Sequence, residues 1–124
     1  MSQNTKARTV LVVDDDPVIR DMMVDILDLE GYPIQVARNG NEALNLLRGR
    51  ENYLVFLDLL MPGLSGHEVC EMLDAEPQVR SRHIIVLMSA LDRLEEARSL
   101  HVDAVMPKPF VVEDVMRVIE PWMG

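Results

Sequence analysis

Acidic side chains follow two apolar runs of the chain, and a serine and a lysine follow two others. Asp14 and Asp15 come after RTVLVV, Asp58 ends YLVFLD, Ser89 follows HIIVLM, and Lys108 stands between two prolines. Several carboxylates brought close together repel one another, so a hard cation such as Mg²⁺ is needed to compensate them. An ammonium group and a hydroxyl group are suited to holding a phosphate. Together these residue types indicate phosphoryl transfer onto Asp58 with Mg²⁺ as the cofactor.

The apolar runs that precede these residues predict buried strands, because they are short, rich in β-branched residues and bounded by turn residues. Amphipathic stretches separate them, so the chain alternates between strand and helix. This alternation predicts an α/β fold, a doubly wound five-stranded parallel sheet of flavodoxin-like (βα)5 type with helices on both faces. The expected strand order is 2-1-3-4-5, which brings the acids after the first and third strands together at the switch point.

The element bounds follow from the apolar runs, caps and breakers. The strands are expected at residues 8–13, 33–38, 53–58, 83–88 and 103–106, and the second at an edge of the sheet. The helices are expected at 17–30, 40–49, 66–76, 92–100 and from 112 onward, with a rigid loop at 107–110. In the first helix an apolar stripe is expected on Val18, Met22, Ile26 and Leu29, widened by Ile19, Met23 and Leu27. Leu91 is expected to point inward from the fourth helix.

Composition limits the partners that this chain can have. Its 124 residues carry a net charge of −9 and are 48% hydrophobic, which suits one domain with a single core. We expect no direct nucleic-acid binding by this chain and no adhesion to an anionic membrane, because both require basic surface. We also expect no membrane span, because no apolar segment is long enough to cross a bilayer. One cysteine, Cys70, and no signal-like segment favour a cytoplasmic location. Residues 1–7 are expected to form a disordered N-terminal tail, and 8–124 to form one domain with no output domain in this chain.

Each candidate residue also has an ordinary structural interpretation. An acid ending a strand can be the N-cap of the next helix, but Ser65 with Glu68 is a better cap pattern for the helix that follows Asp58. Asp16 before Pro17 is interpreted as a cap alone. Serines commonly end strands, so Ser89 carries little weight alone. The order of these residues along an alternating chain is what points to a site.

The motifs VLVVDDDP, VFLDLLMPGLSG, VLMSA and KPF resemble, in order and position, the receiver domain of two-component response regulators from Arg8 to about Trp122. The resemblance implies that Asp58 is the phosphoacceptor, that Asp15, Asp58 and the main-chain carbonyl of Leu60 bind Mg²⁺, and that Asp14 acts through a coordinated water. It also implies that Ser89 is the switch hydroxyl, that Lys108 pairs with the phosphoryl group, and that Ala90 leaves room for it.

The resemblance further implies partners and a way of acting. A histidine kinase or histidine phosphotransfer protein would donate the phosphoryl group, and a downstream effector protein would recognise the result. Such a receiver is not an enzyme in the usual sense, because it catalyses only its own phosphorylation and dephosphorylation. The signal would be relayed at the face formed by the fourth helix, fifth strand and fifth helix, where polar residues including Arg93, Glu96, Glu113 and Arg117 are compatible with a homodimer.

Three positions depart from the family pattern, and two more bear on the lifetime of the phosphoryl group. Val105 stands where receivers usually have Tyr or Phe, so the signal is expected to rest on Ser89 and movement of the fourth helix. His101 replaces a glycine and is expected to end a helix in left-handed geometry, and Val111 replaces a capping acid. Leu60 and Leu91 are apolar where the family controls access of the hydrolytic water, which predicts a long-lived phosphoryl-Asp58.

Other functions are known on similar folds, and two of them require residues that this sequence lacks. An aspartate-nucleophile phosphatase would need a second acid at position 60, which is leucine. A flavin or nucleotide carrier would need a glycine-rich loop where residues 14–16 are acidic. The alternative that stays open is a pseudo-receiver, a phosphorylation-independent scaffold for binding other proteins.

Overall fold

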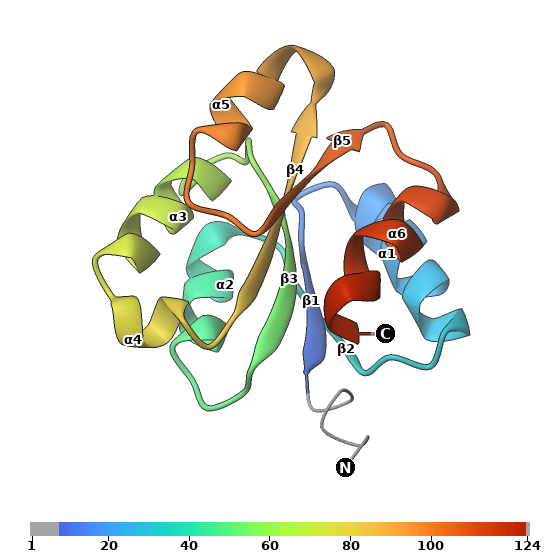
Figure 1. Ribbon diagram of the computed structural model, residues 1–124, viewed down its shortest axis with the longest axis horizontal. Helices are drawn as coiled ribbons and strands as arrows, with labels where there is room; N and C mark the ends of the chain where they lie inside the picture. Colours follow the sequence, from blue (N-terminus) through green and yellow to red (C-terminus); the bar gives the residue numbers. More distant parts are fainter. Residues whose placement is uncertain (1–7, 124) are drawn as a thin grey trace.

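The computed structural model describes residues 8–123 and shows a three-layer α/β arrangement (Figure 1). The tail predicted at 1–7 lies outside the described residues. The sheet is parallel and has the order β2-β1-β3-β4-β5, as predicted. Its strands are β1 (Thr9–Val13), β2 (Ile34–Ala37), β3 (Tyr53–Asp58), β4 (Ile84–Ala90) and β5 (Ala104–Lys108).

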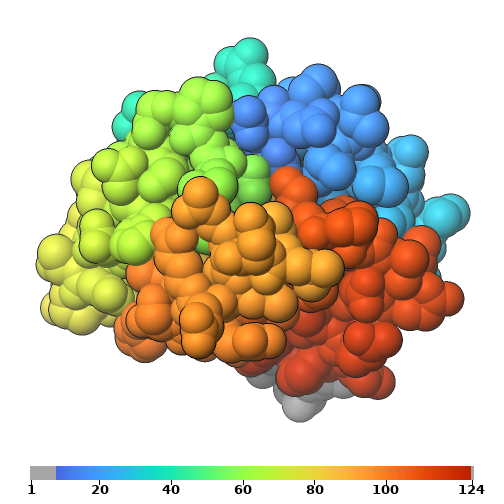
Figure 2. Space-filling view, turned by 90° about the horizontal axis from the view of Figure 1, so that it is seen from above, coloured from blue at the N-terminus to red at the C-terminus, as the bar shows by residue number. Residues whose placement is uncertain are grey.

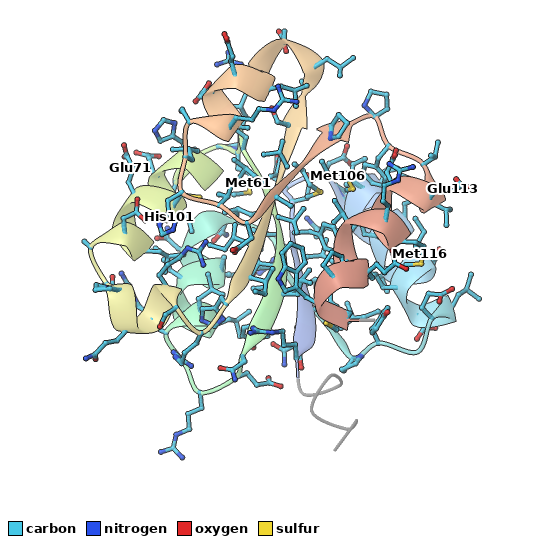
Figure 3. The ribbon with its side chains drawn as sticks, viewed as in Figure 1. Met61, Glu71, His101, Met106, Glu113 and Met116 are labelled. Atoms are coloured by element: carbon cyan, nitrogen blue, oxygen red, sulfur yellow. The ribbon has the colours of Figure 1, made fainter. Side chains whose placement is uncertain are left out.

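Helices cover both faces of this sheet. One face carries α1 (Pro17–Leu29) and α6 (Val112–Met123), and the other carries α2 (Gly40–Leu47), α3 (Gly66–Asp74), α4 (Pro77–Arg80) and α5 (Leu94–Arg98), which the 3-10 turn η2 (Leu91–Arg93) precedes (Figure 1). The sheet therefore separates two apolar clusters. Met61 belongs to the cluster on the α2–α3 side. Met106 belongs to the cluster on the α1–α6 side, against which the partly buried Met116 also packs (Figure 3). Among residues 8–123, no helix has both the length and the apolarity that a membrane crossing demands.

Helix starts follow the predicted caps closely. Asp16 accepts a hydrogen bond from the Val18 amide ahead of α1, and Asn39 accepts one from Glu42 ahead of α2. Ser65 and Glu68 form the complete capping box that opens α3. These side chains satisfy amides that the helix leaves without partners, which is why such short polar residues were reliable signals.

The predicted apolar stripe of α1 is centred on the wrong row, because the row that was expected only to widen it is the one that is buried. Met23 and Leu27 are fully buried, whereas Val18 is 69% exposed and Leu29 87% exposed. Apolar residues occupy two adjacent rows of this helix, so periodicity alone did not determine which row faces the sheet. Packing against β1 and α6 selected the row of Met23 and Leu27.

The other differences concern the second half of the chain. One additional helical turn, α4, begins at Pro77, and the predicted fourth helix is instead the turn η2 followed by the short α5. No side-chain cap starts α5, and Leu91 is 67% exposed rather than inward-facing. β5 continues through Pro107 and Lys108, so the rigid loop expected at 107–110 begins only after Lys108. An edge strand tolerates a proline because its outer amide needs no partner in the sheet.

Candidate functional site

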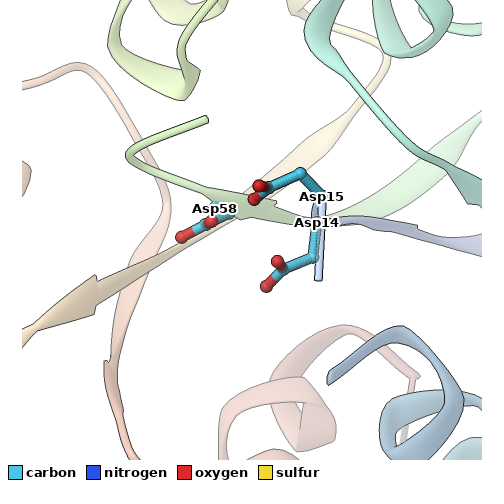
Figure 4. Close-up of side chains that lie close together, drawn as sticks. All are labelled: Asp14, Asp15 and Asp58. Carbon is cyan, nitrogen blue, oxygen red and sulfur yellow. The ribbon is translucent and has the colours of Figure 1, made fainter. Parts of the chain in front are cut away.

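Three carboxylates meet at the carboxyl edge of the sheet. Asp58 is the last residue of β3, and Asp14 and Asp15 follow β1, whose last residue, Val13, pairs with Leu57. Each acid offers an oxygen that lies within 4.8 Å of the other two (Figure 4). Asp14 is fully buried and Asp58 is 7% exposed, whereas Asp15 is open to solvent. The strand order therefore brings Asp58 together with Asp14 and Asp15, which lie 44 and 43 residues earlier in the chain.

Lys108 lies over the two buried carboxylates. It ends β5 opposite Ala90 of β4, and its Nζ donates to Asp14 Oδ2 at 3.0 Å and to Asp58 Oδ1 at 3.3 Å. Burial alone would lower the pKa of Lys108, but the hydrogen bond to Asp14 and the charges of both carboxylates raise it above its usual value. The side chain of Lys108 therefore stays protonated and supplies a positive charge to this site.

The carboxyl group of Asp58 is hard to ionise in this environment. Burial, and then the negative charge of Asp14, raise the pKa of Asp58 to about 6, against the opposing effect of Lys108. A further positive charge at the site would favour the ionised form. The acids and the lysine thus form a site that is incompletely neutralised by its own residues.

Asp14 is held in place by groups that sequence reasoning did not single out. The Asp16 amide donates to Asp14 Oδ1 at 2.9 Å, and Arg20 of α1 donates through Nη1 to the Asp14 carbonyl at 2.7 Å. Arg20 thereby attaches the start of α1 to the acidic loop. The position of Arg20, one turn into α1, could have indicated this contact from the sequence, because a side chain there points back toward the N-terminus of the helix.

A small pocket of about 190 Å³ opens above the phosphoacceptor candidate. Its lining consists of Asp58, Leu59, Leu60, Ser89, Ala90, Arg93 and Lys108. Ser89 is 1% exposed, and its hydroxyl donates to the Ala90 carbonyl at 3.0 Å rather than to Asp58. Leu60 is 49% exposed. Every residue predicted for the site thus lies at this edge of the sheet. Arg93 is an additional member of the site, whereas the sequence alone suggests for it only a possible dimer surface.

The three positions that depart from the receiver pattern, Val105, His101 and Val111, make local contacts. Val105 lies opposite Leu87 in the sheet and is half-buried against the apolar cluster on the α2–α3 side. The expectation of left-handed geometry at His101 is wrong, because within residues 8–123 only Gly31 and Gly63 have positive φ. His101 is exposed and its Nδ1 lies 3.1 Å from Asp74 Oδ1. The Val111 amide donates to Asp114 Oδ2 at 2.8 Å, so an acid of the first turn of α6 satisfies the amide of the residue that precedes the helix.

The response regulator receiver domain matches residues 10–120, so this chain belongs to that family. The DNA-binding response regulator MtrA of Mycolicibacterium smegmatis is 33% identical over 115 residues, which are 91% of this chain and 49% of that protein. The response regulator MprA of Mycolicibacterium vanbaalenii is 34% identical over 110 residues, 86% of this chain and 46% of that protein. The chain therefore spans about half the length of these curated relatives.

Solved structures agree with the fold and the family. The response regulator TrrA of Thermotoga maritima, in complex with Mg²⁺-BeF, is 32% identical with a TM-score of 0.79 and covers 93% of this chain and 98% of its own. A CheY-like receiver domain protein of Methanospirillum hungatei is 27% identical with a TM-score of 0.81, covering 95% of both chains. The acidic cluster and these likenesses indicate a metal site in a signalling protein rather than an ordinary enzyme.

Proposed function

We propose that this chain is a phosphorylation-dependent signalling receiver that accepts a phosphoryl group onto Asp58. The observation that carries the proposal is the convergence of Asp14, Asp15 and Asp58 beneath the Lys108 amine. Two features distinguish this site from an ordinary surface cluster of acids. Asp14 and Asp58 are buried, and one lysine is bonded to both of them. The donor of the phosphoryl group would be a histidine kinase or a histidine phosphotransfer protein.

The residues present fit Mg²⁺, because three hard oxygen donors meet there and Asp58 needs positive charge to ionise. Asp15, Asp58 and the Leu60 main-chain carbonyl would hold the ion, and Asp14 would act through a water. Bound Mg²⁺ would supply charge neutralisation for the incoming phosphoryl oxygens. The relative TrrA is in complex with Mg²⁺-BeF, which supports the same assignment here.

The chain's own residues account for the transfer. An ionised Asp58 oxygen attacks phosphorus while the bond from phosphorus to the donor breaks, and the leaving group keeps the electron pair of that bond. Lys108 moves from the carboxylates toward a phosphoryl oxygen, and the Ser89 hydroxyl leaves the Ala90 carbonyl to donate to another. The small side chain of Ala90 leaves the space that the phosphoryl group occupies.

The signal would leave the site through the face formed by α5, β5 and α6, which corresponds to the fourth helix, fifth strand and fifth helix expected from the sequence. A downstream effector protein would recognise this face, and a homodimer through it is also compatible with its polar residues. The relatives include a DNA-binding regulator of twice this length, but a net charge of −9 supports no direct nucleic-acid binding by this chain itself.

Incubation with acetyl phosphate and Mg²⁺, followed by intact mass, tests the proposal. The wild type should gain one phosphoryl group, whereas Asp58→Asn and a chelator-treated wild type should gain none. Asp16→Asn is the matched control, because Asp16 is an exposed cap whose side chain bonds only the first turn of α1. No gain in the wild type would refute the proposal and favour the pseudo-receiver, a scaffold that binds partners without phosphorylation.

A further inference from the structure

Two cationic side chains line the pocket above Asp58, and they are held very differently. Lys108 is bonded to two buried carboxylates, at 3.0 and 3.3 Å. Arg93, from the turn η2, is bonded through Nη1 to Glu96 Oε1 at 3.2 Å, with 48% of its side chain exposed. Exposed pairs three residues apart contribute little to stability. Arg93 is therefore the more loosely held of the two cations in this pocket.

A phosphoryl group on Asp58 is a better partner for arginine than Glu96 is. It carries more negative charge than a carboxylate and presents three acceptor oxygens. A guanidinium binds such oxygens through two parallel hydrogen bonds, which an ammonium cannot do. The pocket that Arg93 shares with Asp58 provides the space for this contact.

Glu96 connects Arg93 to a second element. Its Oε2 lies 2.9 Å from His67 Nδ1, while its Oε1 accepts from Arg93. His67 is the second residue of α3, and the other side of its ring lies 3.3 Å from Glu71. The preceding residue, Gly66, donates to the Leu59 carbonyl at 2.9 Å, so α3 begins directly against the chain after Asp58. In Figure 2, which looks down on this edge of the molecule, the surface of α5 (orange) lies beside that of α3 (green).

We propose that Arg93 senses phosphorylation by leaving Glu96 to bind the phosphoryl group on Asp58, so that the state of Asp58 is passed to α5 and, through Glu96, to His67 of α3. The inference rests on the proposed function of Asp58. It supplies a polar route for the signal where Val105 has no aromatic ring to rotate. Glu96, released by Arg93, then pairs with His67 alone.

The first test measures binding of beryllofluoride, a phosphoryl mimic, in the presence of Mg²⁺. Arg93→Gln should weaken the apparent affinity on the order of tenfold or more, because a charge-assisted hydrogen bond is lost. Arg93→Lys should recover part of the loss. Arg98→Gln is the matched control, since Arg98 is an exposed arginine at the other end of α5 and lies outside this pocket. Equal affinity in wild type and Arg93→Gln would overturn the inference.

The second test follows the His67 ring by NMR titration before and during phosphorylation by acetyl phosphate. Glu96 and Glu71 already raise the pKa of His67 above its usual value. In the wild type, phosphorylation should raise it further as Arg93 withdraws its positive charge from Glu96. In Arg93→Gln the pKa should be higher from the start and respond less, while Arg98→Gln should behave as the wild type does.

Mass measurement on the same samples separates the two claims. A wild type that gains a phosphoryl group without a shift at His67 would overturn the role of Arg93 and leave the proposed function intact. A wild type that gains no phosphoryl group would refute both. An equal shift in wild type and Arg93→Gln would show that the phosphoryl charge acts on His67 directly, and this result too would overturn the inference.

Discussion

Substitution of Gly66 by alanine should displace the site without touching any of its side chains. A Cβ atom on Gly66 would overlap the carbonyl oxygen of Asp58 and lie 2.9 Å from its carbonyl carbon and 3.0 Å from Leu59 Cα. These neighbours are backbone atoms, which cannot rotate away as a side chain can. Either α3 or the end of β3, which carries Asp58 itself, must therefore move.

The size of the effect follows from the contact. Overpacking of this kind costs roughly 1–3 kcal/mol, and a clash with backbone belongs in the upper half of that range. For a chain of this length each kcal/mol lowers the melting temperature by about 3–5 °C, so we expect Gly66→Ala to melt about 6–15 °C lower. A displacement of about 1 Å at a reacting carboxylate reduces the rate about 100-fold. Phosphorylation by acetyl phosphate should slow accordingly.

Gly31→Ala is the matched control for this experiment. Gly31 ends α1 with a φ of +80°, and a Cβ there would have no neighbour within 4 Å. Alanine in this left-handed geometry costs about 1–2 kcal/mol, so the variant should lose stability yet phosphorylate at the wild-type rate. Thermal melts and the rate of mass gain are measured on both variants. A Gly66→Ala protein as fast as Gly31→Ala would refute the reasoning that α3 fixes the position of Asp58.

Three further predictions concern the rest of the domain. The His83 imidazole, 2% exposed, accepts from the Tyr53 amide at 3.1 Å, and burial lowers its pKa below the ordinary 6.5. The unfolded chain thus binds the proton at His83 more readily, so the contribution of His83 to stability should be full above about pH 6.5 and fall as the pH drops below it. Denaturant melts of His83→Gln should show a flatter decline than those of wild type, and an unchanged decline would count against this assignment. Burial raises the pKa of the Cys70 thiol to about 12, so it should resist thiol reagents at pH 8 in the folded protein, and rapid modification there would contradict the packing. With apolar, exposed side chains at Leu60 and Leu91, phosphoryl-Asp58 should be long-lived, and a half-life of seconds with Mg²⁺ would exclude that prediction.

Strand order and the composition of the site could be predicted from the sequence because both depend on local signals. An uninterrupted apolar run marks a strand buried on both faces, and a polar residue at its end marks the functional edge of the sheet. Asp58 and Lys108 were identifiable in this way although they lie 50 residues apart. Parallel topology then required them to meet.

Features that depend on packing between elements could not be predicted. The rotation of α1 is one, because two rows of apolar residues compete and only the neighbours of Met23 and Leu27 decide between them. Leu91 is another, since the turn η2 replaces the regular helix that would have pointed it inward. Arg93 is the most informative case. Its identity suggested an exposed surface, and only the fold shows that it lines the same pocket as Asp58.

The most direct test of the central claim identifies the residue that carries the phosphoryl group. Borohydride reduces an acyl phosphate to the corresponding alcohol, so treatment of the acetyl phosphate-labelled protein leaves a permanent mass change at the phosphorylated acid. Proteolysis and peptide mass spectrometry then locate it. We predict that the change falls on Asp58 alone and depends on Mg²⁺. A change at Asp14, Asp15 or any other acid, or none at all in protein that is otherwise folded, would contradict the assignment of Asp58.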